Sequence, residues 1–349
     1  NLGQGFMNFP APDFIKEAGR QCVSDDACNQ YSPPRGRPRL LNAVARRYSQ
    51  ILGRELDPNT NIAVSAGANE GLFSVFTAFL DQNVSATAAN EVILMEPAFD
   101  QYTPNITMAG GKPVYVPLRI RSAGDPAQVS ISSKDWKLDI AELESKITSN
   151  TKIIVLNTPH NPLGKVFDQQ ELEAIAEVAK KYNLLVISDE VYENLCLDPD
   201  NQHLSIATLP GMWERTLTVF SAGKLFGITG WRVGWVIGPQ ELVRSTVAAH
   251  TRIVFTTNSP LQEAVAISLE EAESNTFLID QKAVYERCRA KLMKAFDDVG
   301  LPYVCPDGSY FLMVNAAKIK FPADFEFPDY IRQRGRSFKL TYFFTTHIG

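Results

Sequence analysis

Short apolar runs alternate with helix-like segments from about residue 38 onward, and this alternation constrains the fold more than any other feature. The apolar runs occupy residues 61–65, 91–95, 112–116, 152–156, 184–188, 216–220 and 232–238. Each run is continuously hydrophobic rather than alternating, which is typical of strands covered on both faces. Strands that alternate with helices are typical of a mostly parallel sheet. The sequence therefore predicts an α/β fold, with a mostly parallel sheet flanked by helices.

The segments between these runs carry signals for helix starts. Pro38 suits a first helical turn, and apolar residues recur at helical spacing from there until Gly53. The spacing of a capping residue three positions before a glutamate predicts two crossover helices, which begin near Asp139–Glu142 and Asp168–Glu171.

The length of 349 residues exceeds what one hydrophobic core usually organises, so we expect two domains. Residues 38–240 form the predicted large domain. After Pro239 the pattern changes to long helical stretches at about 240–255, 260–273 and 276–298, followed by a strand near 308–315. Residues 241–349 are therefore predicted to form a smaller α+β domain, and residues 1–37 an N-terminal segment.

Charge and cysteine content exclude several classes of protein. The net charge of −5 argues against a protein whose main partner is nucleic acid. The five cysteines are few and follow no metal-binding spacing, which indicates reduced thiols and a cytoplasmic location. No stretch approaches the roughly 18 apolar residues of a membrane helix. Because the chain begins at Asn1, a preceding targeting segment and a mitochondrial location stay open.

Familiar cofactor motifs are absent. There is no G-x-G-x-x-G after a strand, no G-x-x-x-x-G-K-[ST], no H-E-x-x-H and no G-x-S-x-G. These absences argue against dinucleotide, nucleoside triphosphate and zinc-protease chemistry. The four histidines are scattered, and we expect no metal site.

Residues 221–235 contain a lysine where a strand of an open α/β sheet ends, and ligands bind at such ends. Small residues and aromatics surround Lys224, so it could be desolvated enough to form a Schiff base. Ser221 and Arg232 could both reach a phosphate. A surface lysine in a glycine-rich turn is an equally good interpretation of this segment alone.

Other strand ends also present polar or aromatic groups. The run 184–188 leads into Asp189 and Tyr192, and the run 152–156 leads into a turn with Asn157 and Asn161. Each of these could equally be a turn or capping residue. The run 61–65 leads into a helix start at Ala68 and Asn69, where free backbone N–H groups could bind an anion. The run 91–95 leads to Phe99, which could lie on a ring or belong to the core.

At this point the sequence resembles the fold-type I pyridoxal-phosphate enzymes, specifically the class I aminotransferases of the kynurenine aminotransferase, glutamine transaminase and cysteine-S-conjugate β-lyase group. Seven motifs occur in the family's order over residues 1 to about 240: NLGQGF, YSPPRGRPRL, VSAGANEGL, EPAFDQY, NTPHNPLGKVF, ISDEVYE and SAGKLFGITGWRVGW. Each motif is weak alone, and the ordered set is strong.

The resemblance implies pyridoxal 5′-phosphate as cofactor and assigns the catalytic residues. Lys224 would bind the cofactor covalently and, once released, move the proton. Asp189 would pair with the pyridine nitrogen and keep it protonated. Tyr192 and Asn161 would hydrogen-bond the ring oxygen, and Phe99 would stack on the ring.

The same resemblance implies a phosphate site and a substrate site. The phosphate would be held by Ser221, Arg232 and the amides of Ala68 and Asn69, while Tyr31 would reach it from the other subunit of a homodimer. The segment 1–37 would contribute to the small domain and to dimer contacts. Gly5 and Asn161 would face the substrate.

One family feature is not matched. Family members carry an arginine in a further C-terminal stretch that grips the substrate α-carboxylate. Either this arginine lies beyond Gly349, which would leave the small domain incomplete here, or the protein lacks this carboxylate-binding group. The role is not transferred to Arg332, Arg334 or Arg336.

The first functional hypothesis is an aminotransferase that moves an amino group from an aromatic (kynurenine-like) or sulfur-containing amino acid to a 2-oxo acid. The second keeps the cofactor but performs β-elimination on cysteine conjugates, or synthase chemistry. A third is a serine acyl-transfer enzyme, because Ser221 and Lys224 fit S-x-x-K, although the accompanying S-D-N and K-T-G motifs are missing.

A fourth hypothesis is a non-enzymatic polyanion binder built on a basic run. That run comprises Arg35, Arg37, Arg39, Arg46, Arg47 and Arg54. A solvated helix face and dimer rim is the alternative interpretation of the same residues.

Overall fold

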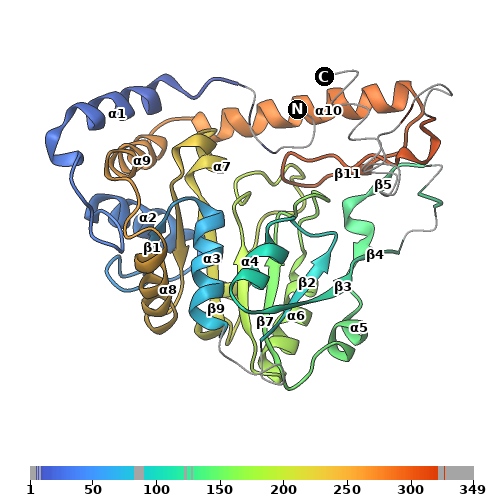
Figure 1. The fold of residues 1–349 in the computed structure, drawn as a ribbon. Coiled ribbons are helices and arrows are strands. Elements are labelled where there is room, and N and C mark those ends of the chain that lie inside the picture. Colours follow the sequence, from blue (N-terminus) through green and yellow to red (C-terminus); the bar gives the residue numbers. More distant parts are fainter. Residues whose placement is uncertain are drawn as a thin grey trace.

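A seven-stranded sheet forms the centre of the molecule in the computed structural model (Figure 1). The structure describes residues 5, 7, 9–81, 90–121, 124–126, 129–320 and 326. In spatial order the strands are β1 (Ile62–Ser65), β10 (Gly234–Ile237), β9 (Thr216–Ser221), β8 (Leu185–Asp189), β7 (Thr151–Asn157), β2 (Glu91–Glu96) and β3 (Lys112–Pro117). Every predicted strand of the large domain is present in this sheet.

Strand direction brings several chain segments to one edge of the sheet. All neighbouring pairs are parallel except those of β10, which runs antiparallel to both β1 and β9. The first residue of β10, Gly234, therefore pairs with the last residues of its neighbours, Ser65 and Ser221. Asn157 and Asp189 pair at the ends of β7 and β8. The carboxyl ends of the parallel strands and the start of β10 thus share one edge.

Helices cover both faces of the sheet. Alternate residues of β7 show this, because Ile153 and Val155 pack with the helices α3 (Ala68–Phe79), α4 (Tyr102–Met108) and α8 (Gln240–Ile253). Ile154 and Leu156 pack on the opposite face with α6 (Gln169–Lys181). Burial on both faces explains why the strands are continuously apolar.

The predicted helix starts are confirmed. The Asp139 side chain accepts a hydrogen bond from Glu142 N at 3.1 Å at the start of α5 (Ile140–Ser145). Asp168 and Glu171 form a reciprocal capping box at the start of α6. Each cap satisfies backbone N–H groups that have no partner within the helix.

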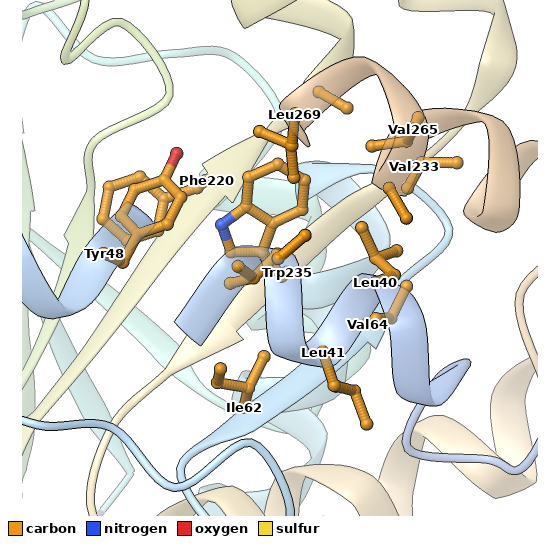
Figure 2. Close-up of a cluster of buried hydrophobic side chains, with 14 of the residues drawn as sticks. Leu40, Leu41, Tyr48, Ile62, Val64, Phe220, Val233, Trp235, Val265 and Leu269 are labelled. Atoms are coloured by element: carbon orange, nitrogen blue, oxygen red, sulfur yellow. The ribbon is translucent and has the colours of Figure 1, made fainter. Parts of the chain in front are cut away.

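A second part of the core joins distant segments of the chain (Figure 2). The ring of Tyr48 of α2 (Pro38–Ile51) packs against those of Phe220 of β9 and Trp235 of β10, with ring centroids 4.2 and 5.6 Å away. Val265 and Leu269 of α9 (Ser259–Ala272) complete the cluster. Helix α9 also packs along α1 (Asp13–Ser24), and α8 packs against α3. The division of the chain at residue 240 stays a prediction.

The chain after α9 differs from one sequence expectation. Helix α10 (Phe277–Asp298) is present as predicted and extends along the top of the molecule in the view of Figure 1. The strand predicted near 308–315 is wrong: β11 covers only Val304–Cys305 and pairs with β5 (Ile131–Ser132). Beyond it there are isolated bridges at Gly308 and Val314. Ser309 has a φ of +58°, which interrupts the extended backbone. Elsewhere in the chain, the remaining α-helix is α7 (Ala222–Phe226), and the remaining strands are β4 (Arg119–Ile120) and β6 (Trp136–Lys137).

The basic run is paired rather than free, which contradicts the polyanion-binder hypothesis. Three arginines of the run form ion pairs with acidic residues on or beside α9: Arg37 with Glu263 at 2.6 Å, Arg39 with Glu270 at 2.6 Å and Arg46 with Glu273 at 2.9 Å. Arg35 donates to backbone carbonyls, Arg47 lies 3.7 Å from Glu193, and Arg54 lies over the Trp213 ring. Within the described ranges, no helix is long and apolar enough to cross a membrane.

Candidate active site

A cavity of about 760 Å³ lies at the edge where the parallel strands end. It is lined by the ends of β7, β8 and β9 and by the start of α3. Arg232, two residues before β10, lines it as well. Ten predicted site residues line it: Gly5, Ala68, Asn69, Phe99, Asn161, Asp189, Tyr192, Ser221, Lys224 and Arg232. Nine of these ten residues follow the five strand ends that the sequence singled out, whereas Gly5 was expected only from the family resemblance.

Asp189 is a buried carboxylate at the wall of this cavity. It is the last residue of β8, and its Oδ2 accepts a hydrogen bond from the Tyr102 hydroxyl at 2.6 Å. Burial raises the pKa of Asp189 from 3.8 to about 6, while the Tyr102 hydrogen bond opposes that shift. Asn157 Nδ2 donates to the backbone carbonyl of Asp189 at 2.9 Å and holds the strand end in place. The carboxylate would gain a strong partner from a cation in the cavity.

Buried polar groups behind Asp189 anchor the same strand end. Glu190 Oε1 accepts hydrogen bonds from the hydroxyls of Ser188 and Ser205 at 2.6 and 2.7 Å. Its Oε2 lies 2.7 Å from His203 Nε2. Burial disfavours the imidazolium, yet the adjacent Glu190 carboxylate raises the pKa of His203 overall. Side-chain hydrogen bonds thus hold Ser188 and Glu190, the residues before and after Asp189 in the chain.

Lys224 places an amine in the same cavity. It lies in α7, directly after β9, and its Nζ donates to the Gly5 carbonyl at 2.8 Å and to the Tyr310 hydroxyl at 2.6 Å. Burial lowers the pKa of Lys224 to about 8, against the opposing effect of the Asp189 charge. A buried amine with a pKa near neutrality is a good nucleophile and proton carrier.

The contacts of Lys224 also bear on the serine acyl-transfer hypothesis. That chemistry requires the lysine amine to act on the Ser221 hydroxyl. Both hydrogen bonds of Lys224 Nζ instead go to Gly5 and Tyr310. The geometry does not favour Ser221 as a nucleophile.

The start of α3 and Arg232 form a concave group of hydrogen-bond donors. Gly67 precedes α3 with a φ of +81°, and the first N–H groups of a helix have no carbonyl partner within it. Arg232 adopts an uncommon φ of +53°. A Cβ on Gly67 would lie 2.5 Å from Arg232 Nη2, so only glycine leaves room for the guanidinium there. With Ser221 at the adjacent strand end, these groups suit an anion such as phosphate.

Aromatic rings and amides form the remaining walls. The Tyr192 ring centroid lies 5.6 Å from Lys224 Nζ, and Phe99 packs edge-on against Tyr102 at 5.4 Å. Asn161 N donates to Asn157 Oδ1 at 2.6 Å, which orients the turn after β7. These walls offer flat apolar surfaces beside hydrogen-bonding groups.

Tyr31 lies outside this cavity. Its side chain is 82% exposed, and its ring contacts the exposed ring of Phe255 with centroids 5.2 Å apart. The predicted role of Tyr31 in a second subunit stays a prediction. Arg332, Arg334 and Arg336 lie outside the described residues. Among the described residues no group of three or more His, Cys, Asp or Glu could hold a metal ion.

The sequence interpretation missed three residues of the site. Tyr102, which binds Asp189, lies within the EPAFDQY motif but was not assigned a role. Tyr310 and Phe311 lie in the segment interpreted as a strand. The partners of Tyr102 and Tyr310 are 87 and 86 residues away along the chain, so no local spacing signals these contacts.

Comparisons with known proteins agree with this geometry. A family model for aminotransferase class I and II matches residues 1–335. A Saccharomyces cerevisiae protein named probable kynurenine–oxoglutarate transaminase BNA3 is 41% identical, with 100% of this chain and 77% of that protein covered. Kynurenine–oxoglutarate transaminase 1 of Homo sapiens is 43% identical, with 92% of this chain and 75% of that protein covered. This chain therefore spans about three quarters of these relatives.

Solved structures show the same fold. The crystal structure of Bna3p from Saccharomyces cerevisiae aligns with a TM-score of 0.90 at 41% identity, covering 99% of this chain and 79% of that one. N-succinyldiaminopimelate aminotransferase from Mycobacterium tuberculosis aligns with a TM-score of 0.81 at 34% identity, covering 90% and 77%. The large sheet and its helices are thus shared with both proteins.

Proposed function

Since this chain belongs to the class I and II aminotransferase family and is an aminotransferase, we propose that it binds pyridoxal 5′-phosphate and transfers the amino group of an aromatic or sulfur-containing amino acid to a 2-oxo acid. One observation carries the proposal: the Lys224 amine and the Asp189 carboxylate both line a cavity whose wall also carries anion-binding groups. Members of this family are generally dependent on that cofactor.

The residues of the cavity fit the cofactor on three independent counts. Among the described residues, the buried Asp189 carboxylate accepts hydrogen bonds only from the Tyr102 hydroxyl and the Val191 amide, so a protonated pyridine nitrogen would supply the missing counter-charge. The start of α3, with Arg232 beside Gly67, suits a phosphate. The amine of Lys224 has a pKa lowered to about 8 by burial, which suits attack on an aldehyde.

Residues of this chain would hold the cofactor at each of its groups. Asp189 would bind the pyridine nitrogen, while Tyr192 and Asn161 would donate to the ring oxygen. Phe99 would lie on the ring. The phosphate would be bound by Ser221, Arg232 and the amides of Ala68 and Asn69, all of which line the cavity.

When bound, the cofactor supplies an electron sink for the bond that breaks at the substrate α-carbon. The protein contributes the rest. The Lys224 amine, partly neutral near pH 8, takes up a proton at Nζ and returns it from the same atom. The backbone hydrogen bond from Asn157 and the hydroxyl of Tyr102 keep Asp189 oriented.

The donor amino acid is proposed from the cavity walls together with the relatives. Tyr192 and Phe311 line the cavity, with ring centroids 6.0 Å apart. Flat apolar walls favour an aromatic side chain, which packs edge-on or offset against such rings. The two relatives described above carry kynurenine–oxoglutarate transaminase in their names. We therefore propose a kynurenine-like donor with Gly5 and Asn161 facing it.

The alternative on the same residues is β-elimination from cysteine conjugates. Both reactions begin with loss of the substrate α-proton, and both would use Lys224 and Asp189. Pyruvate release separates them: a lyase forms pyruvate from a cysteine conjugate without an added 2-oxo acid, whereas a transaminase does not turn over without one.

Borohydride reduction followed by peptide mass mapping tests the covalent site. We expect the reduced protein to carry the pyridoxyl group on Lys224. A label on another lysine, or none on protein saturated with the cofactor, would contradict the assignment. The Lys224→Ala variant serves as control, since it should bind the cofactor without becoming labelled and should lose transamination.

A further inference from the structure

Two groups from distant parts of the chain meet at the Lys224 amine. Lys224 Nζ lies 2.8 Å from the Gly5 carbonyl oxygen and 2.6 Å from the Tyr310 hydroxyl oxygen. The Tyr310 hydroxyl also donates to the Gly5 carbonyl at 2.8 Å. The three atoms therefore form a closed triangle of hydrogen bonds, and Tyr310 lies 305 residues from Gly5.

The triangle determines to which partner the Tyr310 hydroxyl donates and from which it accepts. A phenol has one proton, and here that proton is donated to the Gly5 carbonyl. The Tyr310 oxygen therefore accepts from the amine. Both neighbours of Lys224 Nζ are thus acceptors, and an ammonium group, with its three donors, satisfies both at once.

Packing holds both acceptors in position. The Tyr310 ring is stacked with Tyr285, with centroids 5.9 Å apart and planes 17° apart, and packs edge-on against Tyr192 at 5.1 Å. A Cβ on Gly5 would lie 2.6 Å from Phe311 Cζ and 3.1 Å from the Tyr310 hydroxyl. The backbone of residue 5 approaches the ring this closely only because residue 5 is a glycine.

We propose that the Tyr310 hydroxyl and the Gly5 carbonyl form a holding site for the free Lys224 amine, and that Tyr310 is a catalytic residue. The site holds the free amine at the cavity wall and favours its ammonium form over its neutral form. This inference rests on the proposed function, because only a cofactor-binding lysine alternates between a bound and a free state.

The holding site affects the first step of cofactor binding. To attack the aldehyde of pyridoxal 5′-phosphate, the ammonium must first lose one proton to solvent. The C–N bond then forms, and the carbonyl oxygen leaves as water. Each acceptor that favours the ammonium raises the pH at which the attacking form appears. Removing the Tyr310 hydroxyl therefore lowers that pH.

The experiment measures how fast cofactor-free protein takes up pyridoxal 5′-phosphate as a function of pH. The change in visible absorption reports the covalent bond in the wild type, in Tyr310→Phe and in Tyr303→Phe. The control Tyr303 is also a buried tyrosine; its hydroxyl donates to Asp297 at 3.2 Å, and it does not line the cavity. The titrations of the cofactor itself are common to all three proteins and cancel in the comparison.

In the wild type the midpoint of the pH–rate profile is expected near 8, the pKa of Lys224. In Tyr310→Phe it falls by about one pH unit, the effect of one hydrogen bond to a charged group. Tyr303→Phe keeps the wild-type midpoint. Gly5→Ala displaces both acceptors and shifts the midpoint in the same direction, so it provides a second variant should Tyr310→Phe fold poorly.

The outcomes separate the two proposals. If the wild type forms no covalent bond with the cofactor, the proposed function fails. If the wild type forms it but Tyr310→Phe has an unchanged or raised midpoint, the holding site is wrong while the proposed function stands.

Discussion

The Asp189 side chain is buried, yet its proposed role requires the carboxylate to be ionised. Its burial raises its pKa to about 6, so the ionised form that pairs with a cation is costly in the cofactor-free protein. This cost lowers the stability of the cofactor-free protein, and a bound cofactor with a protonated pyridine nitrogen would offset it. Asp189 does accept one backbone hydrogen bond, from Val191 N at 3.4 Å, but this bond lowers its pKa by less than burial raises it.

At this residue we predict that Asp189→Asn stabilises the cofactor-free protein while it slows transamination. The folded pKa of Asp189 lies above its unfolded value of 3.8. The folded state therefore binds the extra proton between about pH 4 and 6, and the carboxylate lowers stability as the pH rises through that window. Above pH 6 the amide removes a cost on the order of 3 kcal/mol, and below pH 4 the two proteins converge.

Thermal unfolding of the cofactor-free proteins at pH 4 and pH 8 checks the stability difference. Steady-state kinetics should show a fall in kcat of about 100-fold or more, because the amide cannot support the positive pyridine nitrogen. Near-wild-type turnover together with unchanged stability would mean that Asp189 acts only as a turn residue.

Among the elements, the start of α3 depends on the strand order of the sheet. Because β10 is antiparallel to its neighbours, Arg232 lies at the same edge as the start of α3. Gly67 permits the approach, since its φ of +81° and its missing side chain leave space for the guanidinium. The proposed anion site thus requires two elements that lie far apart in the sequence.

For this element we predict that Gly67→Ala weakens binding of pyridoxal 5′-phosphate at least 10-fold, while binding of pyridoxal, which has no phosphate, changes much less. The added Cβ would lie 2.5 Å from Arg232 Nη2 and displace it from the site. A charge-assisted hydrogen bond to phosphate is worth about 1.5–3 kcal/mol, which sets the expected loss. Equilibrium titration of both ligands measures it.

Gly53→Ala is the matched control for this prediction. Gly53 also has a positive φ, +59°, but a Cβ there has no atom within 4 Å. The Gly53→Ala variant therefore has the backbone strain of a residue at positive φ, but its Cβ does not collide with a neighbouring atom. Equal losses for pyridoxal and pyridoxal 5′-phosphate in Gly67→Ala would show that the helix start does not bind the phosphate.

For the whole molecule, the proposed homodimer gives Tyr31 its role. Tyr31 and Phe255 are both large, exposed aromatic residues, 82% and 52% exposed, and their rings are in contact. Paired exposed aromatic rings are typical of a surface that another chain covers. The Tyr31 hydroxyl would then lie at the phosphate of the second subunit.

Hybrid dimers test this arrangement. We predict that Lys224→Ala and Tyr31→Ala, each poor at transamination as a pure dimer, regain activity when their subunits are unfolded and refolded together. In a hybrid dimer one site combines both substitutions and the other has neither, so random pairing restores about a quarter of the wild-type sites. If Tyr31 acts within its own subunit, every hybrid site carries one defect. Mixing then restores no activity.

The sequence by itself determined the residues that stand at strand ends. Continuous apolar runs identify buried strands, and the residues that follow such a run are placed at the carboxyl edge of a parallel sheet by strand direction alone. Asp189, Asn161, Phe99 and Lys224 were found in this way, and the structure places all four at one cavity. Local capping signals at Asp139 and Asp168 were equally readable, because each cap lies within three residues of its partner.

Only the tertiary structure decided which groups surround those residues. The antiparallel direction of β10 and the contacts of Tyr102 with Asp189 and of Tyr310 with Lys224 have no local signal in the chain. Residues near 310 are apolar enough to resemble a strand, yet the positive φ of Ser309 and the packing of Tyr310 on Tyr285 turn them toward the cavity. Spacing along the chain reports periodic burial, whereas contacts between residues more than 80 positions apart depend on how the elements pack.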